Sequence, residues 1–169
     1  MRAKLPTQEG FVERDGVKLH YEIYGNGPQT MVFVPSWVIV HSRIYKAQLP
    51  YFSERFRCIT YDGRGNGQSD RPEDVAAYSL DNYVADVLAV MDATDAGQAI
   101  LVGLSYGGLL GSILAAHHPE RVKAAILAGT VATGLVLAIV RAMRWRPADI
   151  AITPDQAPVA HSATCGPAR

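Results

Sequence analysis

One stretch constrains the fold of this chain more than any other: residues 99–110, with the sequence AILVGLSYGGLL. Its first four residues form a short apolar run, with the length and composition of a strand buried on both faces. After the segment GLSYG, apolar residues recur at helical spacing, at Leu109, Leu110, Ile113 and Leu114. The stretch therefore predicts a strand, a tight turn and a helix in direct succession.

The turn has the pattern G-x-S-x-G, and its spacing has a physical reason. A chain that leaves a strand and enters a helix within so few residues strains the backbone of Ser105 and lifts its hydroxyl above the sheet. Neighbouring chain then passes close to Gly103 and Gly107, where a side chain would clash. The bare pattern arises easily by chance in a chain with 15 glycines, but its place between strand and helix predicts a nucleophile elbow.

Length, composition and charge indicate the class of protein and exclude some partners. A chain of 169 residues, 49% hydrophobic and 19% charged, is typical of one soluble globular domain. Its formal net charge is zero, so we expect neither nucleic acid nor an anionic membrane as a partner. Cys58 and Cys165 have no disulfide or metal-ligand spacing, and residues 1–10 lack the apolar core of a signal peptide. We therefore expect a cytoplasmic protein without a metal site.

The rest of the chain alternates strand and helix patterns. Residues 11–14 and 17–24 flank an Asp-Gly pair and predict a β-hairpin. Further strands are predicted at 30–34, 57–61 and 121–127, and helices at 43–56, interrupted at Pro50, and from Leu80, with Ser79 as N-cap. The pattern predicts an α/β fold: a mostly parallel sheet with an N-terminal hairpin and helices on both faces. The loops at Pro35, Asp62 and Ser105 fall at the carboxyl edge of this sheet, where active sites lie.

The character of the sequence changes near residue 130. We assign residues 1–130 to the core and residues 131–169 to a divergent tail. Residues 133–146 are apolar with interspersed arginines, typical of an amphipathic helix. From residue 147 the chain is rich in Ala and Pro and has little periodicity, which predicts loop or disorder.

Several features together resemble the α/β-hydrolase superfamily, in its serine-esterase and haloperoxidase-like branch. They are the elbow at Ser105, the hairpin and strand order, the segment DGRGNGQS at 62–69, which looks like D-x-R-G-x-G-x-S, and the segment HPERV at 118–122. The resemblance covers about residues 10 to 130 and implies a cofactor-free serine hydrolase of a carboxylic ester or related acyl compound. It implies Ser105 as nucleophile and the backbone N–H of Tyr106 as one oxyanion donor.

The second oxyanion donor comes from the loop after an earlier strand. Members of the superfamily often carry His-Gly there, whereas this chain has Pro35-Ser36-Trp37. The resemblance therefore implies the N–H of Trp37 as the matching donor. A large packing side chain at the strand end is the alternative role of Trp37, and the two roles are compatible.

The catalytic partners of Ser105 are unknown from the sequence. In this fold the triad runs in the order Ser, then Asp or Glu, then His, because the serine needs a base and the base needs an orienting carboxylate. Asp149, Asp155 and His161 follow Ser105 in that order, but they lie in the Ala- and Pro-rich tail, where no strand is predicted. We expect a hydrolase core that is truncated on its C-terminal side and catalytically incomplete.

The other histidines are weaker candidates for a base. We expect His20 to be exposed on the hairpin. His41 follows Trp37 near the site edge, as a substrate contact or simply a polar loop residue. His117 and His118 lie at the far end of the helix that starts after Ser105.

Asp62 opens the glycine-rich loop at the predicted site edge. We expect it to bind backbone N–H groups of that loop rather than to act as a catalytic acid, with Arg64 as a candidate ion-pair partner. The loop has neither the dinucleotide-binding pattern nor a P-loop, so no cofactor is expected.

A non-catalytic binding module derived from a hydrolase is the alternative function. The strand after Arg121 would lie at an uncovered sheet edge, and residues 136–140 are apolar. Such surfaces favour self-association, which a concentration-dependent mass would reveal. The expected ligand in either case is a small ester-like molecule whose identity the sequence does not fix.

Overall fold

An N-terminal hairpin begins the sheet. The computed structural model describes residues 4–36 and 40–130, in which β1 (Gln8–Arg14) and β2 (Val17–Tyr24) pair antiparallel. The connecting Asp15 and Gly16 have φ values of 51° and 74°. A two-residue hairpin turn of this kind needs positive φ at both positions, which an Asp-Gly pair tolerates. The predicted hairpin is confirmed.

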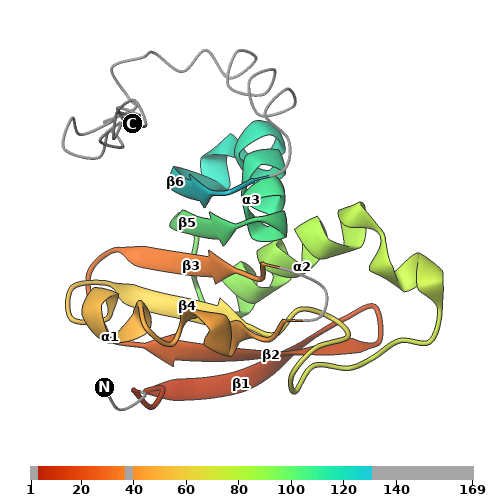
Figure 1. Cartoon of the computed structure of the whole chain (residues 1–169), viewed down its shortest axis with the longest axis horizontal. Helices are drawn as coiled ribbons and strands as arrows, with labels where there is room; N and C mark the ends of the chain where they lie inside the picture. The colour runs from red at the N-terminus through yellow and green to blue at the C-terminus, as the bar shows by residue number, and fades with distance from the viewer. Residues whose placement is uncertain (1–3, 37–39, 131–169) are drawn as a thin grey trace, which may run out of the picture.

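Four further strands complete a sheet with the order β1-β2-β4-β3-β5-β6 (Figure 1). They are β3 (Thr30–Val34), β4 (Arg57–Tyr61), β5 (Ala99–Leu104) and β6 (Val122–Ala128). β2 pairs antiparallel with β4, whereas β3 pairs parallel with β4 and β5, and β5 pairs parallel with β6. The mostly parallel α/β sheet predicted from the sequence is therefore confirmed, with β6 as an edge strand among the described residues.

Helical segments cover both faces of the sheet (Figure 1). α2 (Leu80–Ala93) and α3 (Tyr106–His117) lie on one face, and η1 (Ser42–Tyr45) and α1 (Leu49–Phe52) lie on the other. Two short 3-10 turns, η2 (Val75–Tyr78) and η3 (Pro119–Arg121), precede α2 and β6. Ser79 caps α2 as predicted, because its side chain accepts a hydrogen bond from the N–H of Asn82.

The long helix predicted over residues 43–56 is wrong. The structure has a 3-10 turn followed by a four-residue helix, with Pro50 in the first turn of the latter. Proline lacks the N–H that a helix interior requires, so it fits only at a helix start. The apolar spacing of the segment instead serves the packing of Tyr45 and Leu49 against the sheet.

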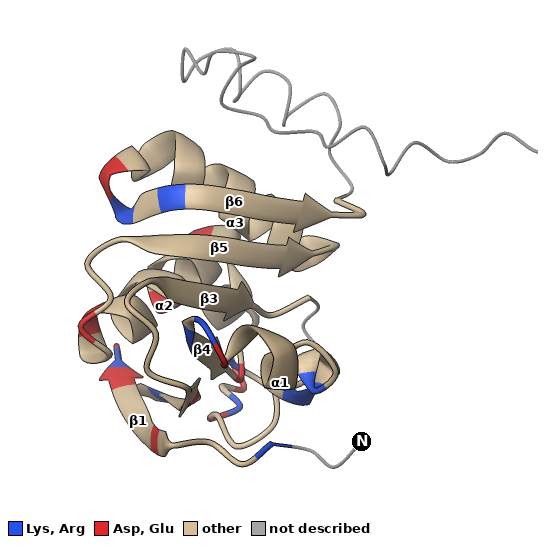
Figure 2. Cartoon of the chain, turned by 90° about the vertical axis from the view of Figure 1, so that its left-hand side faces the viewer, with Lys and Arg blue, Asp and Glu red and all other residues tan. Residues whose placement is uncertain are grey.

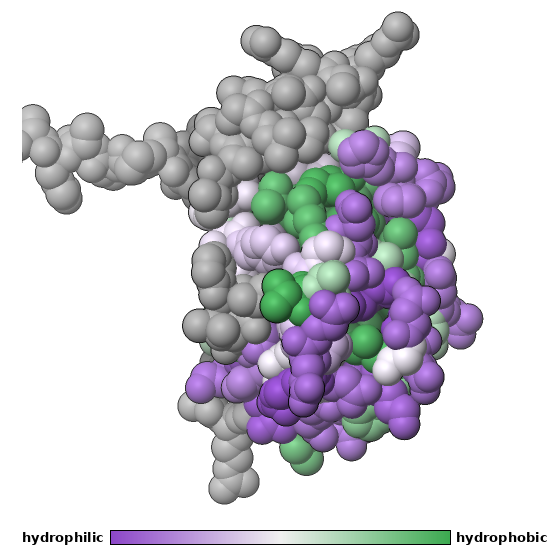
Figure 3. All heavy atoms as spheres, turned by 90° about the vertical axis from the view of Figure 1, so that its right-hand side faces the viewer, coloured by the Kyte–Doolittle hydropathy of each residue, from purple (hydrophilic) through white to green (hydrophobic). Residues whose placement is uncertain are grey.

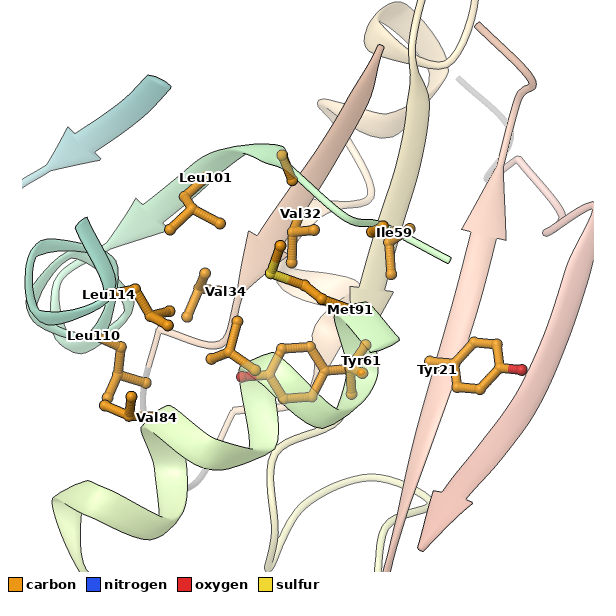
Figure 4. Packing of buried hydrophobic residues seen from close by; sticks show 14 of the residues in the cluster. Tyr21, Val32, Val34, Ile59, Tyr61, Val84, Met91, Leu101, Leu110 and Leu114 are labelled. Carbon is orange, nitrogen blue, oxygen red and sulfur yellow. The ribbon is translucent and has the colours of Figure 1, made fainter. Parts of the chain in front are cut away.

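Alternate residues of the central strands face two separate cores. Val32 and Val34 of β3 pack with Met91 of α2 and Leu114 of α3 (Figure 4). Met31 and Phe33 point the other way, against the residues of η1 and α1. In Figure 2 the ribbons of β3 and β5 carry no charged residue, as expected for strands buried on both faces.

The surface facing the viewer in Figure 3 is largely hydrophilic, with hydrophobic side chains gathered in small groups.

Within residues 4–36 and 40–130, no helix has the length and hydropathy needed to cross a membrane. The predicted tail at 131–169, including its amphipathic segment at 133–146, lies outside the described residues.

A buried ion network joins three elements that are far apart in the sequence. Asp86 of α2 is fully buried, and its carboxylate accepts hydrogen bonds from Nε and Nη2 of Arg64 at 2.7 and 2.6 Å. Nε of Arg14, on β1, donates to the same carboxylate at 2.9 Å. The expected pairing of Arg64 with Asp62 is therefore wrong, since the guanidinium turns toward α2. The hydrogen bonds to Asp86 raise the pKa of Arg64, which keeps it charged despite its burial.

The connection from β5 to α3 depends on close backbone contacts. A Cβ atom added to Gly103 would lie 2.3 Å from the carbonyl oxygen of Gly107, and one added to Gly107 would lie 2.6 Å from that of Val34. Both distances are far below a van der Waals contact, and backbone atoms cannot move aside cheaply. The two glycines of G-x-S-x-G therefore let β5, α3 and the end of β3 meet without a loop, as predicted.

Replacing Asp86 tests the buried network. Asp86→Ala leaves two buried or half-buried guanidinium groups without their counter-charge and should lower the free energy of unfolding by about 3–5 kcal/mol. Asp92→Ala is the matched control, because Asp92 is largely exposed in its pair with Arg121 and should cost less than about 1 kcal/mol. Urea unfolding measures both, and equal losses for the two variants would contradict the assignment.

Replacing Gly107 tests the close contact at the turn. Gly107→Ala should lower the free energy of unfolding by about 2 kcal/mol or more, because its methyl group meets the backbone of β3. Gly97→Ala is the control: a Cβ there would have nothing within 4 Å and should change stability by less than about 0.5 kcal/mol. A Gly107→Ala protein as stable as the control in thermal and urea unfolding would show that the contact does not constrain the fold.

Candidate functional site

Ser105 has the strained backbone that its position predicts. Its φ of 54° and ψ of −115° lie in a region that residues with side chains rarely adopt. The Ser105 N–H donates to the carbonyl of Ala128 at 2.8 Å, and the Ser105 carbonyl accepts from the N–H groups of Gly108 and Leu109. Both the edge strand β6 and the first turn of α3 therefore hold the residue in this conformation.

The side chain of Ser105 is half-buried, and its hydroxyl makes no hydrogen bond to another described residue. Ser105 precedes the first turn of α3, a helix of 12 residues. The N–H groups of a helix start favour a developing negative charge. The geometry therefore offers an unpaired hydroxyl beside a partial positive charge, which suits attack on an electrophilic carbon.

One of the two expected oxyanion donors is engaged within the protein. The backbone N–H of Tyr106 donates to the carbonyl oxygen of Ser36 at 3.1 Å, across from the end of β3. Trp37, the other expected donor, lies outside the described residues. An oxyanion would have to replace the Ser36 carbonyl as the acceptor of the Tyr106 N–H.

Aromatic rings line the start of α3. The rings of Tyr106 and Tyr83 meet edge to face with their centroids 5.6 Å apart, and Tyr78 lies beyond Tyr83 at 6.5 Å. Burial raises the pKa of Tyr83 to about 12 and also raises the pKa of Tyr106. The phenols of Tyr83 and Tyr106 therefore stay neutral near pH 7, so the surface that they form beside Ser105 carries no charge.

Asp62 anchors the loops at the carboxyl edge of the sheet, as the sequence predicts. Its buried carboxylate accepts from the N–H of Gln68 in its own loop at 2.9 Å and from the N–H of Ser42 at 2.8 Å. A Cβ on Gly67 would overlap the same carboxylate at 2.0 Å, and φ at Gly67 is 51°. The role of Asp62 is to fold two loops together, and the bond to Ser42 adds a partner that the sequence did not suggest.

His20 is buried, with 2% of its surface exposed, so the prediction of an exposed side chain is wrong. The strand β2 lies between β1 and β4 and is covered along most of its length. The ring of Phe11, which faces His20 in the β1–β2 register, lies 5.1 Å from it. His20 Nδ1 lies 3.7 Å from a carboxylate oxygen of Asp62, which was not foreseen because residues 20 and 62 are distant in the sequence.

The other histidines do not reach Ser105 in the described structure. His41 is exposed and caps η1, with its Nδ1 accepting from the N–H of Arg43. His117 ends α3, about 18 Å along the helix from Ser105, and His118 lies beyond it, 3.7 Å from Glu120. Among the described residues no imidazole pairs with Ser105.

Asp149, Asp155 and His161 lie outside the described residues. The acid and base partners of Ser105 are thus not placed by the structure. Two cavities occur among the described residues: one of about 530 Å³ beside Tyr24 and Leu49, and one of about 240 Å³ beside Glu22 and Asp62. Neither of these two cavities is lined by Ser105.

Known proteins are similar to this chain in both sequence and fold. The chain is 34% identical over 116 residues to 3-oxoadipate enol-lactonase 2 of Acinetobacter baylyi, covering 69% of this chain and 43% of that protein. It is 36% identical over 130 residues to a cis-3-alkyl-4-alkyloxetan-2-one decarboxylase of Shewanella oneidensis, covering 75% of this chain and 40% of that protein. The chain thus spans less than half the length of these relatives.

Solved structures agree with the sequence relatives. The enol-lactonase of Burkholderia xenovorans superposes with a TM-score of 0.67 at 32% identity, covering 73% of this chain and 47% of that one. Est816, described as an N-acyl homoserine lactone degrading enzyme, gives a TM-score of 0.66 at 35% identity, covering 72% of this chain and 45% of that one.

The sequence model of the alpha/beta hydrolase fold matches residues 29–155, which include β3, the Ser105 turn and residues beyond position 130. The match spans most of the chain, and the sheet order and the strained serine agree with it. The chain therefore belongs to the alpha/beta hydrolase fold family, in which the sequence had placed it by resemblance.

Proposed function

We propose that the protein is a serine hydrolase that acts on a carboxylic ester or a related acyl compound, with Ser105 as its nucleophile. The observation that carries the proposal is the strained backbone of Ser105 at the junction of β5 and α3. Strain of this kind persists only where the surrounding structure enforces it, and it clusters at functional sites. Membership of a family of hydrolases supports the reaction class.

In the proposed reaction, Oγ of Ser105 attacks the carbonyl carbon of the ester while its proton passes to a general base. The carbonyl oxygen becomes an oxyanion that accepts from the N–H groups of Tyr106 and Trp37. The alcohol then leaves, and water hydrolyses the acyl-enzyme. One such donor typically contributes about 3 kcal/mol to transition-state stabilisation, which exceeds the roughly 1 kcal/mol net contribution of a typical hydrogen bond such as that from Tyr106 to Ser36.

The ester class rests on two observations. Serine forms acyl-enzymes by adding to a carbonyl carbon, which esters and lactones both offer. Two of the similar proteins are named for lactones, which are cyclic esters. A cytoplasmic location belongs to the proposal as well, supported by the free and buried thiol of Cys58.

A second candidate is a non-catalytic binding module with a hydrolase fold. It is favoured by the bond between the Tyr106 N–H and the Ser36 carbonyl, which occupies the donor that catalysis needs. Ile126 on the edge strand and Leu104 beside it are 49% and 39% exposed, which would suit self-association. This candidate predicts a mass that rises with concentration in sedimentation and no covalent chemistry at Ser105.

Labelling with a fluorophosphonate separates the two candidates. We expect one adduct per chain in the intact mass, formed over hours because none of the described residues acts as a base at Ser105. Ser105→Ala should abolish the adduct. Ser112→Ala is the control, since Ser112 is buried in α3 and its hydroxyl donates to the carbonyl of Gly108. Absence of any adduct on the folded protein after a day would refute the serine nucleophile.

The rate of the same labelling tests whether the chain is catalytically incomplete. Stoichiometric labelling of Ser105 within minutes would contradict the expectation that the chain is catalytically incomplete. Loss of that fast reaction in His161→Ala would then identify His161 as the base.

A further inference from the structure

Three side chains on the hairpin gather potential metal ligands at one place. Glu9 of β1 faces Glu22 of β2 in the strand register, and His20 lies two residues before Glu22. Residues two apart on a strand share a face, and opposed residues of paired strands share it too. One ligand atom from each of the three residues lies within 4.8 Å of the others.

The carboxylate of Glu22 is buried beside a cavity that Lys4, Arg43 and Lys46 also line. Glu22 is 4% exposed, and its one hydrogen bond among the described residues comes from the hydroxyl of Tyr24 at 2.7 Å. No lysine or arginine of the described residues forms an ion pair with it. A buried carboxylate with a single neutral donor is costly unless a cation compensates it.

His20 supplies an independent observation. More than nine-tenths of it is buried, and its Nδ1 has no hydrogen-bond partner among the described residues. Nε2 of the ring faces a carboxylate oxygen of Glu9 at 3.8 Å and the amide nitrogen of Gln68 at 3.4 Å, while Nδ1 faces Asp62 at 3.7 Å. Nε2 is therefore the nitrogen that faces Glu9, and Nδ1 points toward Asp62 without forming a hydrogen bond. A histidine that binds a metal through one nitrogen commonly donates its other N–H to a carboxylate, and Asp62 is the carboxylate on that side of His20.

We infer that Glu9, His20 and Glu22 form a site for a divalent cation of the Zn²⁺ type. One imidazole nitrogen and two carboxylate oxygens are ligands that this class of ion accepts, and two carboxylates balance its charge. Ligand atoms around tetrahedral zinc are about 3.4 Å apart. The ring and Glu9, now 3.8 Å apart, need to approach by a few tenths of an ångström, and the widest pair of the three ligand atoms, within 4.8 Å, by up to about 1.4 Å.

The surroundings of the three residues suit an ion that keeps an open coordination position. The side chain of Glu9 is 63% exposed and free to adjust. Glu22 also lines the cavity of about 240 Å³, from which water can complete the coordination shell. Arg43 lines the same cavity, and Lys4 and Lys46 line the larger cavity beside Glu22, but all three residues are exposed, so solvent screens their charges. A bound ion would tie β1 to β2 and, through His20, to the loop that Asp62 anchors.

The test is a titration of the chelator-treated full chain with Zn²⁺ alone, followed by calorimetry, and with Co²⁺, followed by its absorption spectrum. We expect one ion per chain and a rise of about 5 °C or more in the unfolding midpoint at saturating Zn²⁺. Glu9→Gln and His20→Gln should each weaken binding at least tenfold. Glu9→Gln changes an exposed side chain, so it keeps the test decisive if His20→Gln fails to fold.

The controls replace two potential metal ligands outside the proposed site. His118→Gln and Cys165→Ser should leave the stoichiometry and affinity for Zn²⁺ unchanged. Binding that survives Glu9→Gln and His20→Gln, binding that is lost in a control, or no binding at millimolar Zn²⁺ would each overturn the proposed site.

Discussion

The β5–α3 junction depends on backbone atoms that touch where no side chain would fit. Gly107 lies against the carbonyl of Val34, and Gly103 lies against Gly107 itself. This contact fixes the start of α3 over the end of β3, and the backbone of Ser105 takes a strained conformation as the consequence. The same contact brings Ser36 next to Tyr106. The strained conformation of Ser105 and the hydrogen bond from the Tyr106 N–H to the Ser36 carbonyl therefore have one structural cause.

Buried charge is treated in two different ways in this molecule. Asp86 is paired with Arg64 and Arg14, and the network links the first strand, the loop after β4 and α2. Glu22 and His20 are equally buried, yet neither has a charged partner within hydrogen-bonding distance. A buried carboxylate without a close opposite charge is destabilising unless a cation compensates it, and this is why the second cluster points to a bound cation.

Much of the fold could be predicted from local patterns. The bounds of β3 and β4 and the cap at Ser79 followed from apolar runs and a capping residue, and the elbow followed from G-x-S-x-G in its context. The helix predicted over residues 43–56 failed for a local reason, the proline at position 50, whereas two other failures were of long-range origin. The burial of His20 depends on β1 and β4 flanking β2, and the partner of Arg64 lies 22 residues away on α2.

The central claim is that packing, without substrate, holds Ser105 in its strained conformation. Residue-resolved hydrogen exchange by NMR on the free protein tests it most directly. The amide of Ser105, which donates to Ala128, should exchange about as slowly as that of Leu101 in β5, because both open only when the sheet does. Exchange of the Ser105 amide at the rate of an unstructured peptide, while Leu101 stays protected, would contradict the account.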